Sequence, residues 1–85
     1  MYLHLGKGWV VSGRDIVAIF DLDNSSQSHI TRKYLSAAEK AGQVINAAED
    51  IPKSFIVTES KKERRVYLSQ MASATLLKRW ESGTM

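Results

Sequence analysis

The chain has 85 residues and a mass of 9.5 kDa, which leaves room for one domain. It contains no cysteine, so disulfides, thiolate zinc sites and cysteine nucleophiles are excluded. Twelve Lys and Arg against nine Asp and Glu give a formal net charge of +3, a mild excess that is compatible with nucleic acid without requiring it.

The composition is typical of a folded globular domain, because 44% of the residues are hydrophobic and 25% are charged. The apolar runs are too short to span a membrane. The amino-terminal residues lack the basic region and long apolar stretch of a signal peptide. We therefore expect a cytoplasmic protein without a membrane partner.

The first part of the chain predicts three short strands separated by two turns. Residues 2–5 alternate weakly, and residues 9–12 are rich in aromatic and β-branched side chains, as strands are. Glycines at both ends of residues 6–8 favour a tight turn there, and residues 13–15 form a second break. Residues 16–20 are nearly all apolar, which predicts a strand covered on both faces.

A polar, turn-rich segment over residues 21–27 precedes a predicted helix. Ser28 can cap that helix with its hydroxyl, and Gly42 is placed to end it. Apolar residues recur at helical spacing between these ends and predict one buried stripe: Ile30, Tyr34, Ala37, Ala38 and Ala41.

The second half of the chain predicts a strand, a hairpin and a second helix. A short strand over residues 43–46 is followed by a loop over residues 47–53. Residues 55–58 and 66–69 read as two strands joined by a charged turn at residues 60–63. The fold class expected is α+β: a small, mostly antiparallel sheet of five or six short strands with two helices.

The last predicted element is a short helix capped by Ser73. Leu76, Leu77 and Trp80 would form its apolar face. We expect one domain over residues 1–85, with residues 82–85 frayed.

The residues do not form a catalytic constellation. His4 and Ser12 lack a third orienting group and a glycine elbow to present the serine. Asp21 and Asp23 lack the glycine and glutamate of a calcium-binding loop, so turn formation and capping are the simpler roles. We expect no enzymatic activity, no metal and no cofactor.

Two single cations stand at the ends of predicted strands. Arg14 lies in the break before an apolar strand, from which its guanidinium can reach a phosphate or base edge. The alternative for Arg14 is an ion pair with Asp15 or with a neighbouring subunit. Lys53 follows Pro52 just before a clearly predicted strand, where it would be presented to a ligand. The alternative is that Lys53 is a solvated lysine of the loop.

The densest run of positive charge lies at the predicted hairpin, where only Glu63 interrupts Lys61, Lys62, Arg64 and Arg65. Such a hairpin tip can enter a nucleic-acid groove or lie along a phosphate backbone. It can equally serve to keep the edges of the sheet soluble.

Two tryptophans are large apolar groups for a domain of this size. Trp9 and Trp80 can fill the core, or they can lie where subunits meet, since Trp is enriched at interfaces. We assign both to an oligomer interface.

Three segments resemble the RemA/RemB family of bacterial extracellular matrix regulatory proteins. The opening stretch carries most of the likeness, and the region around residues 24–50 carries least. The segments are Met1-Tyr2-Leu3-His4-Leu5-Gly6 continuing into Trp9-Val10-Val11-Ser12-Gly13-Arg14-Asp15-Ile16, then Pro52-Lys53-Ser54-Phe55-Ile56-Val57-Thr58, and Leu68-Ser69 with Ser73-Ala74-Thr75-Leu76-Leu77-Lys78-Arg79.

The resemblance implies a small α+β subunit, a ring-shaped homo-oligomer and DNA laid along that ring. It also implies that Arg14 matches an arginine of the DNA-binding surface in RemA, an activator of biofilm matrix operons. RemA carries an arginine pair in the loop before its central strand, whereas this loop reads Glu49-Asp50-Ile51-Pro52. Fewer arginines should weaken DNA binding, because each phosphate contact contributes to the salt-dependent affinity.

Together these observations predict a DNA-binding transcriptional regulator of extracellular matrix genes, acting as a ring-shaped homo-oligomer on the phosphate backbone. The alternative is an oligomeric scaffold that does not bind DNA. Expected partners are double-stranded DNA, further copies of the chain and a RemA-type sister protein. The predicted nucleic-acid-binding residues are Arg14, Lys53, Lys61, Lys62, Arg64 and Arg65.

Overall fold

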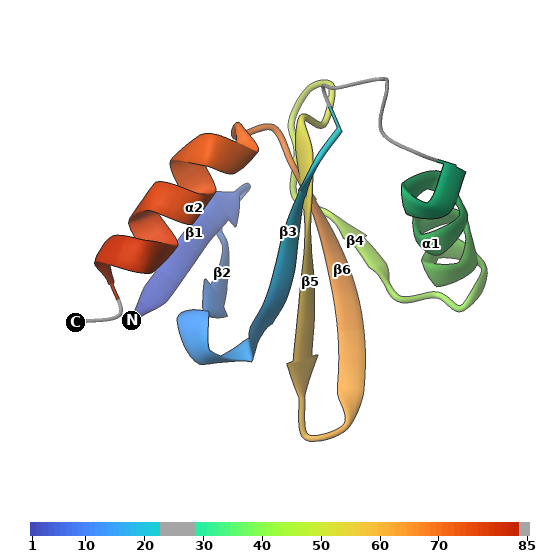
Figure 1. The fold of residues 1–85 in the computed structure, drawn as a ribbon, viewed down its shortest axis with the longest axis horizontal. Helices are drawn as coiled ribbons and strands as arrows, with labels where there is room; N and C mark the ends of the chain where they lie inside the picture. Colours follow the sequence, from blue (N-terminus) through green and yellow to red (C-terminus); the bar gives the residue numbers. More distant parts are fainter. Residues whose placement is uncertain (23–28, 84–85) are drawn as a thin grey trace.

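A computed structural model describes residues 1–22 and 29–83 of the chain (Figure 1). In chain order the elements are β1 (Tyr2–Gly6), β2 (Trp9–Ser12), the 3₁₀ turn η1 (Gly13–Asp15), β3 (Ile16–Asp21), α1 (His29–Lys40), β4 (Val44–Asn46), β5 (Ser54–Ser60), β6 (Glu63–Ser69) and α2 (Ser73–Ser82). Over the described residues these are six strands and two helices, so the predicted α+β class is confirmed.

The strands form two sheets rather than the one that was predicted. β1 and β2 make an antiparallel hairpin of their own. The other four strands are ordered β3-β5-β6-β4, with β4 parallel to β6 and the remaining neighbours antiparallel. The predicted, mostly antiparallel pairing is therefore confirmed. The β1–β2 hairpin is not part of the larger sheet but packs against one of its faces.

The four-stranded sheet is covered on both faces (Figure 1). On one face Phe55, Val57 and Val66 pack with Ala38 of α1. On the other face the core is shared with α2, β1 and β2, and its buried members are Leu3, Leu5, Val11, Ile16, Ala47, Ile56, Tyr67 and Leu76. Successive residues of a strand point to opposite faces, so a central strand feeds both cores.

The strand covered on both faces is β5, not β3. Residues Ser54 to Thr58 of β5 are all buried. β3 lies at the edge of the sheet, and its Val17 is 55% exposed where the pairing with β5 shifts by one residue. The apolar run at β3 predicted a doubly covered strand because periodicity does not report the order of strands in a sheet.

Helix α1 packs through fewer alanines than its pattern predicts. Ala38 is buried, whereas Ala37 and Ala41 are exposed. Tyr34 stacks on Phe55 with ring centroids 6.4 Å apart. Of the turn-rich segment predicted over residues 21–27, Asp21 instead ends β3. Residues 23–27 and the predicted cap Ser28 lie outside the described residues, and so does the side chain of Ile30. Gly42 follows the helix with a φ of 72°, the left-handed conformation expected at that position.

Helix α2 begins at Ser73, with Ala72 in the capping position and no side-chain cap. The predicted cap is therefore one residue too late. Leu76 is buried, Trp80 is half-buried and Leu77 is exposed, so the apolar face is narrower than predicted. Neither helix in residues 1–22 and 29–83 is long and apolar enough to cross a membrane.

Candidate nucleic-acid interface

Arg14 stands on a short turn that other parts of the chain hold in place. The backbone N–H of buried Gly13 donates to the carbonyl of Met1 at 2.9 Å, and the indole N–H of Trp80 donates to the carbonyl of Gly13 at 2.9 Å. Ser12 Oγ accepts the backbone N–H of Arg14 at 3.4 Å. The turn is thereby tied to the chain's first residue and to α2, which makes it a fixed platform for the guanidinium.

Gly13 packs directly against the side chain of Met1. A Cβ at this position would come within 2.5 Å of Met1 Sδ and 3.4 Å of Trp80 Cδ1. Any larger residue would therefore have to displace the methionine side chain. Close packing at Gly13 brings Met1 and Trp80 of α2 together at the Arg14 turn.

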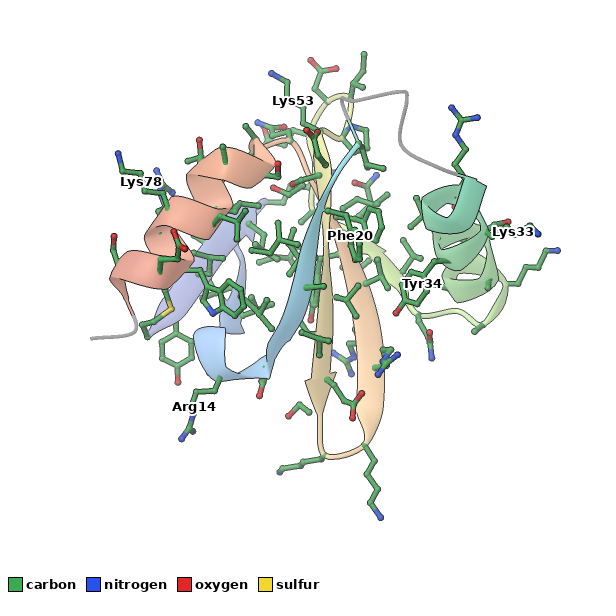
Figure 2. All side chains as sticks on the ribbon, viewed as in Figure 1. Arg14, Phe20, Lys33, Tyr34, Lys53 and Lys78 are labelled. Atoms are coloured by element: carbon green, nitrogen blue, oxygen red, sulfur yellow. The ribbon has the colours of Figure 1, made fainter. Side chains whose placement is uncertain are left out.

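The Arg14 side chain is exposed and points away from the body of the molecule (Figure 2). In the part of the chain that the structure describes, its guanidinium forms no ion pair with Asp15. One alternative interpretation of Arg14, the local ion pair, is therefore not observed. The group remains available to an anion or to another subunit.

The β5–β6 hairpin projects beyond the rest of its sheet. Ile16 of β3 pairs with Thr58, and Val44 of β4 pairs with Val66, so residues 59–65 extend past both neighbouring strands. We call this segment the ribbon. It lies at the same end of the molecule as the Arg14 turn, because β3 enters the sheet beside Thr58 (Figure 1).

The tip of the ribbon is a two-residue turn made by lysines. Lys61 and Lys62 have φ values of 51° and 69°, both left-handed. Hairpin turns of this length favour two left-handed residues, a conformation that asparagine and glycine adopt more readily than lysine. The turn therefore presents two exposed ammonium groups from a strained backbone.

The two arginines of the ribbon point to opposite faces and are both paired with glutamates. Nη2 of Arg64 lies 2.5 Å from Glu59 Oε1, and Nη2 of Arg65 lies 2.8 Å from Glu63 Oε1. The hydrogen bond with Glu59 is the main cause that raises the pKa of Arg64, and Tyr34 adds to it. These side chains are about half exposed, so each pair contributes little to stability.

Arg65 is held in the same way on the other face of the ribbon. Its hydrogen bond with Glu63 raises its pKa, with a further contribution from Tyr67. The dense positive run of the sequence is thus divided between two faces, and half of its cations already have an acidic partner. Lys61 and Lys62 are the cations of the ribbon that the two glutamates leave unpaired.

Lys53 lies at the opposite end of the molecule from Arg14 (Figure 2). The seven residues of β5 separate it from the ribbon tip, a distance of roughly 20 Å at the usual rise of a strand. Its backbone N–H donates to the carbonyl of Ser69 at 2.8 Å, and its carbonyl accepts from Leu22 at 2.8 Å. A single subunit therefore brings Arg14 together with Lys61 and Lys62, but not with Lys53.

A cleft of about 490 Å³ opens between the β1–β2 hairpin and the ribbon. The residues of β1, β2 and the Arg14 turn that line it are Tyr2, Val10, Val11, Ser12 and Asp15. Those of the β5–β6 hairpin are Thr58, Ser60, Lys61, Glu63, Arg65 and Tyr67. Tyr2 is 77% exposed and Val10 is 49% exposed. The cleft thus combines exposed apolar side chains with hydroxyl and charged groups.

The tryptophans differ in their surroundings. Trp9 is 40% exposed, and its ring lies 5.8 Å from that of Tyr67. Trp80 is half-buried and uses its indole N–H within the subunit, on Gly13. An interface role for either residue stays a prediction, but Trp80 already has a role in positioning the Arg14 turn.

The sequence places Arg14 in a break between strands, as observed, but does not indicate which contacts hold that turn. The contact between Trp80 and Gly13 joins positions 67 residues apart, and no local pattern signals it. The Glu63–Arg65 pair had a detectable signal, because residues two apart on a strand share a face.

Comparison with known proteins places this fold in a family. The model of the RemA-like family, described as "Extracellular matrix regulatory protein A-like", matches residues 2–80. The chain belongs to the RemA-like family. It is 39% identical over 79 residues to the Extracellular matrix regulatory protein B of Bacillus subtilis (strain 168), a match covering 93% of this chain and 89% of that protein. The family resemblance predicted from the sequence is confirmed, and both names designate regulatory proteins rather than enzymes.

Proposed function

We propose that this RemA-like protein is a cytoplasmic, DNA-binding regulator of the transcription of extracellular matrix genes. The observation that carries the proposal is the Arg14 guanidinium, which is exposed, unpaired with Asp15 and mounted on a turn anchored to Met1 and Trp80. A guanidinium held in this way binds phosphate oxygens with little loss of side-chain and backbone freedom. The relative's name, Extracellular matrix regulatory protein B, supports the regulatory role.

Binding depends on repetition of the subunit in a ring-shaped homo-oligomer. One subunit offers Arg14 with two neighbouring lysines, and such a small number of phosphate contacts gives negligible affinity at physiological salt. Several copies on one rigid assembly bind by avidity. Exposed apolar side chains on the amino-terminal hairpin, including Tyr2, Trp9 and Val10, support association between subunits.

The other predicted cations take secondary roles. Lys61 and Lys62 lie at the Arg14 end and can extend the same phosphate-binding surface. Arg64 and Arg65 reach DNA only if they leave Glu59 and Glu63. Lys53, at the far end, contacts a different stretch of DNA or the DNA of a neighbouring copy.

The test is retardation of promoter DNA by the Arg14→Ala variant at low salt. We expect a loss of affinity of about tenfold or more, because one phosphate contact disappears from every copy in the assembly. The dependence of the binding constant on salt should become shallower in the same variant. Lys33→Ala is the matched control, since Lys33 is an exposed cation on α1, away from the Arg14 turn (Figure 2). Unchanged binding by Arg14→Ala would reject this function.

A second candidate is an oligomeric scaffold that binds protein, including a RemA-type sister subunit, and no DNA. The pairing of Arg64 and Arg65 with glutamates favours it, because that pairing lowers the free positive charge of the ribbon. A stable oligomer that fails to shift any duplex DNA at low salt would support the scaffold.

A further inference from the structure

The cleft between the β1–β2 hairpin and the ribbon is lined by charged groups of both signs. Asp15 and Glu63 contribute carboxylates, and Lys61 and Arg65 contribute cations. Glu63 and Arg65 are paired with each other at 2.8 Å. Within the described part of the chain Asp15 and Lys61 form no ion pair, and they come from the two sides of the cleft. The formal charges of these four groups therefore cancel.

This balance disfavours a charged ligand. A phosphate or carboxylate group in the cleft would lie near Asp15 or Glu63, and an ammonium group would lie near Lys61 or Arg65. Like charges repel at such short range, and the repulsion offsets the attraction of the opposite charges. A neutral ligand avoids the repulsion. It must nevertheless be polar, because covering these groups without giving them hydrogen bonds costs free energy.

Hydroxyl groups on the walls add further donors and acceptors. Ser12 Oγ accepts the backbone N–H of Arg14 at 3.4 Å, which leaves its own proton to donate. Ser60 adds an exposed hydroxyl from the ribbon. Each hydroxyl of a ligand can donate one hydrogen bond and accept two, so it can serve a carboxylate and an ammonium group alike. The lining therefore fits a ligand that carries many hydroxyls.

An exposed aromatic ring stands at the same cleft. Tyr2 is 77% exposed and lies opposite Ser12 in the pairing of β1 with β2, so the two side chains share a face. The C–H groups of a sugar ring form an apolar surface that packs on an aromatic face, while the hydroxyls at the ring edge reach polar neighbours. A cleft of about 490 Å³ has room for one or two sugar rings.

We propose that this cleft binds a neutral carbohydrate of one or two hexose units. Tyr2 packs against the sugar ring, Ser12 and Asp15 bind hydroxyls from one side, and Lys61 binds a hydroxyl from the ribbon. Because Ser12 and Asp15 flank Arg14, the sugar contacts the turn that carries the guanidinium. Arg14 does not line the cleft, so the proposal does not depend on DNA binding.

The first test is saturation-transfer NMR on the unmodified protein with glucose, galactose, cellobiose and lactose as probes. We expect at least one of them to bind with a dissociation constant of about 1 mM or below. Glucuronate and glucosamine carry one negative and one positive charge on the same kind of ring, and both should bind more weakly than the best neutral sugar. Absence of binding by all four neutral sugars at about 10 mM, or tighter binding of either charged sugar, would overturn the proposal.

Two matched pairs of variants locate the sugar. Lys61→Ala and Asp15→Ala should each weaken binding about tenfold, because each removes a hydrogen-bonding group from the cleft. Lys62→Ala changes a neighbouring lysine that does not line the cleft, and Glu39→Ala removes an exposed carboxylate from α1. These two controls should bind the sugar as the unmodified protein does.

Equal losses within either pair would place the sugar elsewhere and reject the cleft. Circular dichroism of each variant verifies that it is folded. The measurements contain no DNA, so the result of the Arg14→Ala retardation assay and the result of the sugar titration are independent of each other.

Discussion

The Arg14 turn and the ribbon carry positive charge in opposite ways. Arg14 is a single cation whose backbone is anchored to Met1 and Trp80 and whose guanidinium is free of Asp15. The ribbon has four cations, but two of them are paired with Glu59 and Glu63 and the other two stand on a strained turn. The difference shows that cations clustered in the sequence can already be paired within the fold and so be less available to a ligand. A single exposed arginine on an anchored turn stays available.

The largest effect should come from removing the anchor of the Arg14 turn. We expect Trp80→Ala to lower the free energy of unfolding by about 3 kcal/mol, since it removes half-buried aromatic packing and leaves the Gly13 carbonyl with the backbone N–H of Ile16 as its remaining donor. Trp80→Phe keeps most of the packing and should cost about 1 kcal/mol. Urea unfolding followed by fluorescence of Trp9 measures both. A Trp80→Phe variant as stable as the unmodified protein would contradict the role of the hydrogen bond.

A smaller effect of opposite sign is expected at the tip of the ribbon. Lys61→Asn combined with Lys62→Gly should stabilise the fold by about 1 kcal/mol, because these residues adopt the left-handed backbone with less strain. Lys61→Ala with Lys62→Ala removes the same charges without relieving the backbone, and should not stabilise. Thermal unfolding separates the two double variants. Stabilisation by the alanine pair would assign the effect to charge repulsion instead.

The smallest effect tests whether the ion pair with Glu63 keeps Arg65 from binding DNA. Glu63→Gln removes the charge that holds Arg65, so DNA affinity at low salt should rise about two- to threefold, the scale of an exposed ion pair. Glu39→Gln changes the net charge equally at an exposed site on α1. Equal gains in the two variants would mean that only overall charge matters, and would place Arg65 outside the DNA contact.

The sequence was most informative where structure is local. The turn predicted at residues 60–63 is observed between β5 and β6, and Gly42 ends α1 in the left-handed conformation. These features follow from the backbone preferences of residues adjacent in the chain. The same reasoning located Arg14 correctly in a break between strands.

Long-range pairing explains what could not be predicted. The apolar run of β3 is equally compatible with an edge and a central strand, and only its neighbours decide that Val17 is exposed. The separation of β1 and β2 into their own sheet depends on packing against α2 and β6, far along the chain. The availability of each cation likewise depends on which carboxylate the register places beside it, as Glu59 beside Arg64 illustrates.

The packing of Met1 against Gly13 and Gly83 has a practical consequence. The carbonyl of Met1 accepts from Gly13, and a Cβ on Gly83 would collide with the Met1 side chain. An affinity tag or fluorescent protein fused ahead of Met1 would therefore emerge beside the guanidinium that we assign to DNA. Binding assays on this family are best done with a label on the exposed face of α1, for example at Ser36.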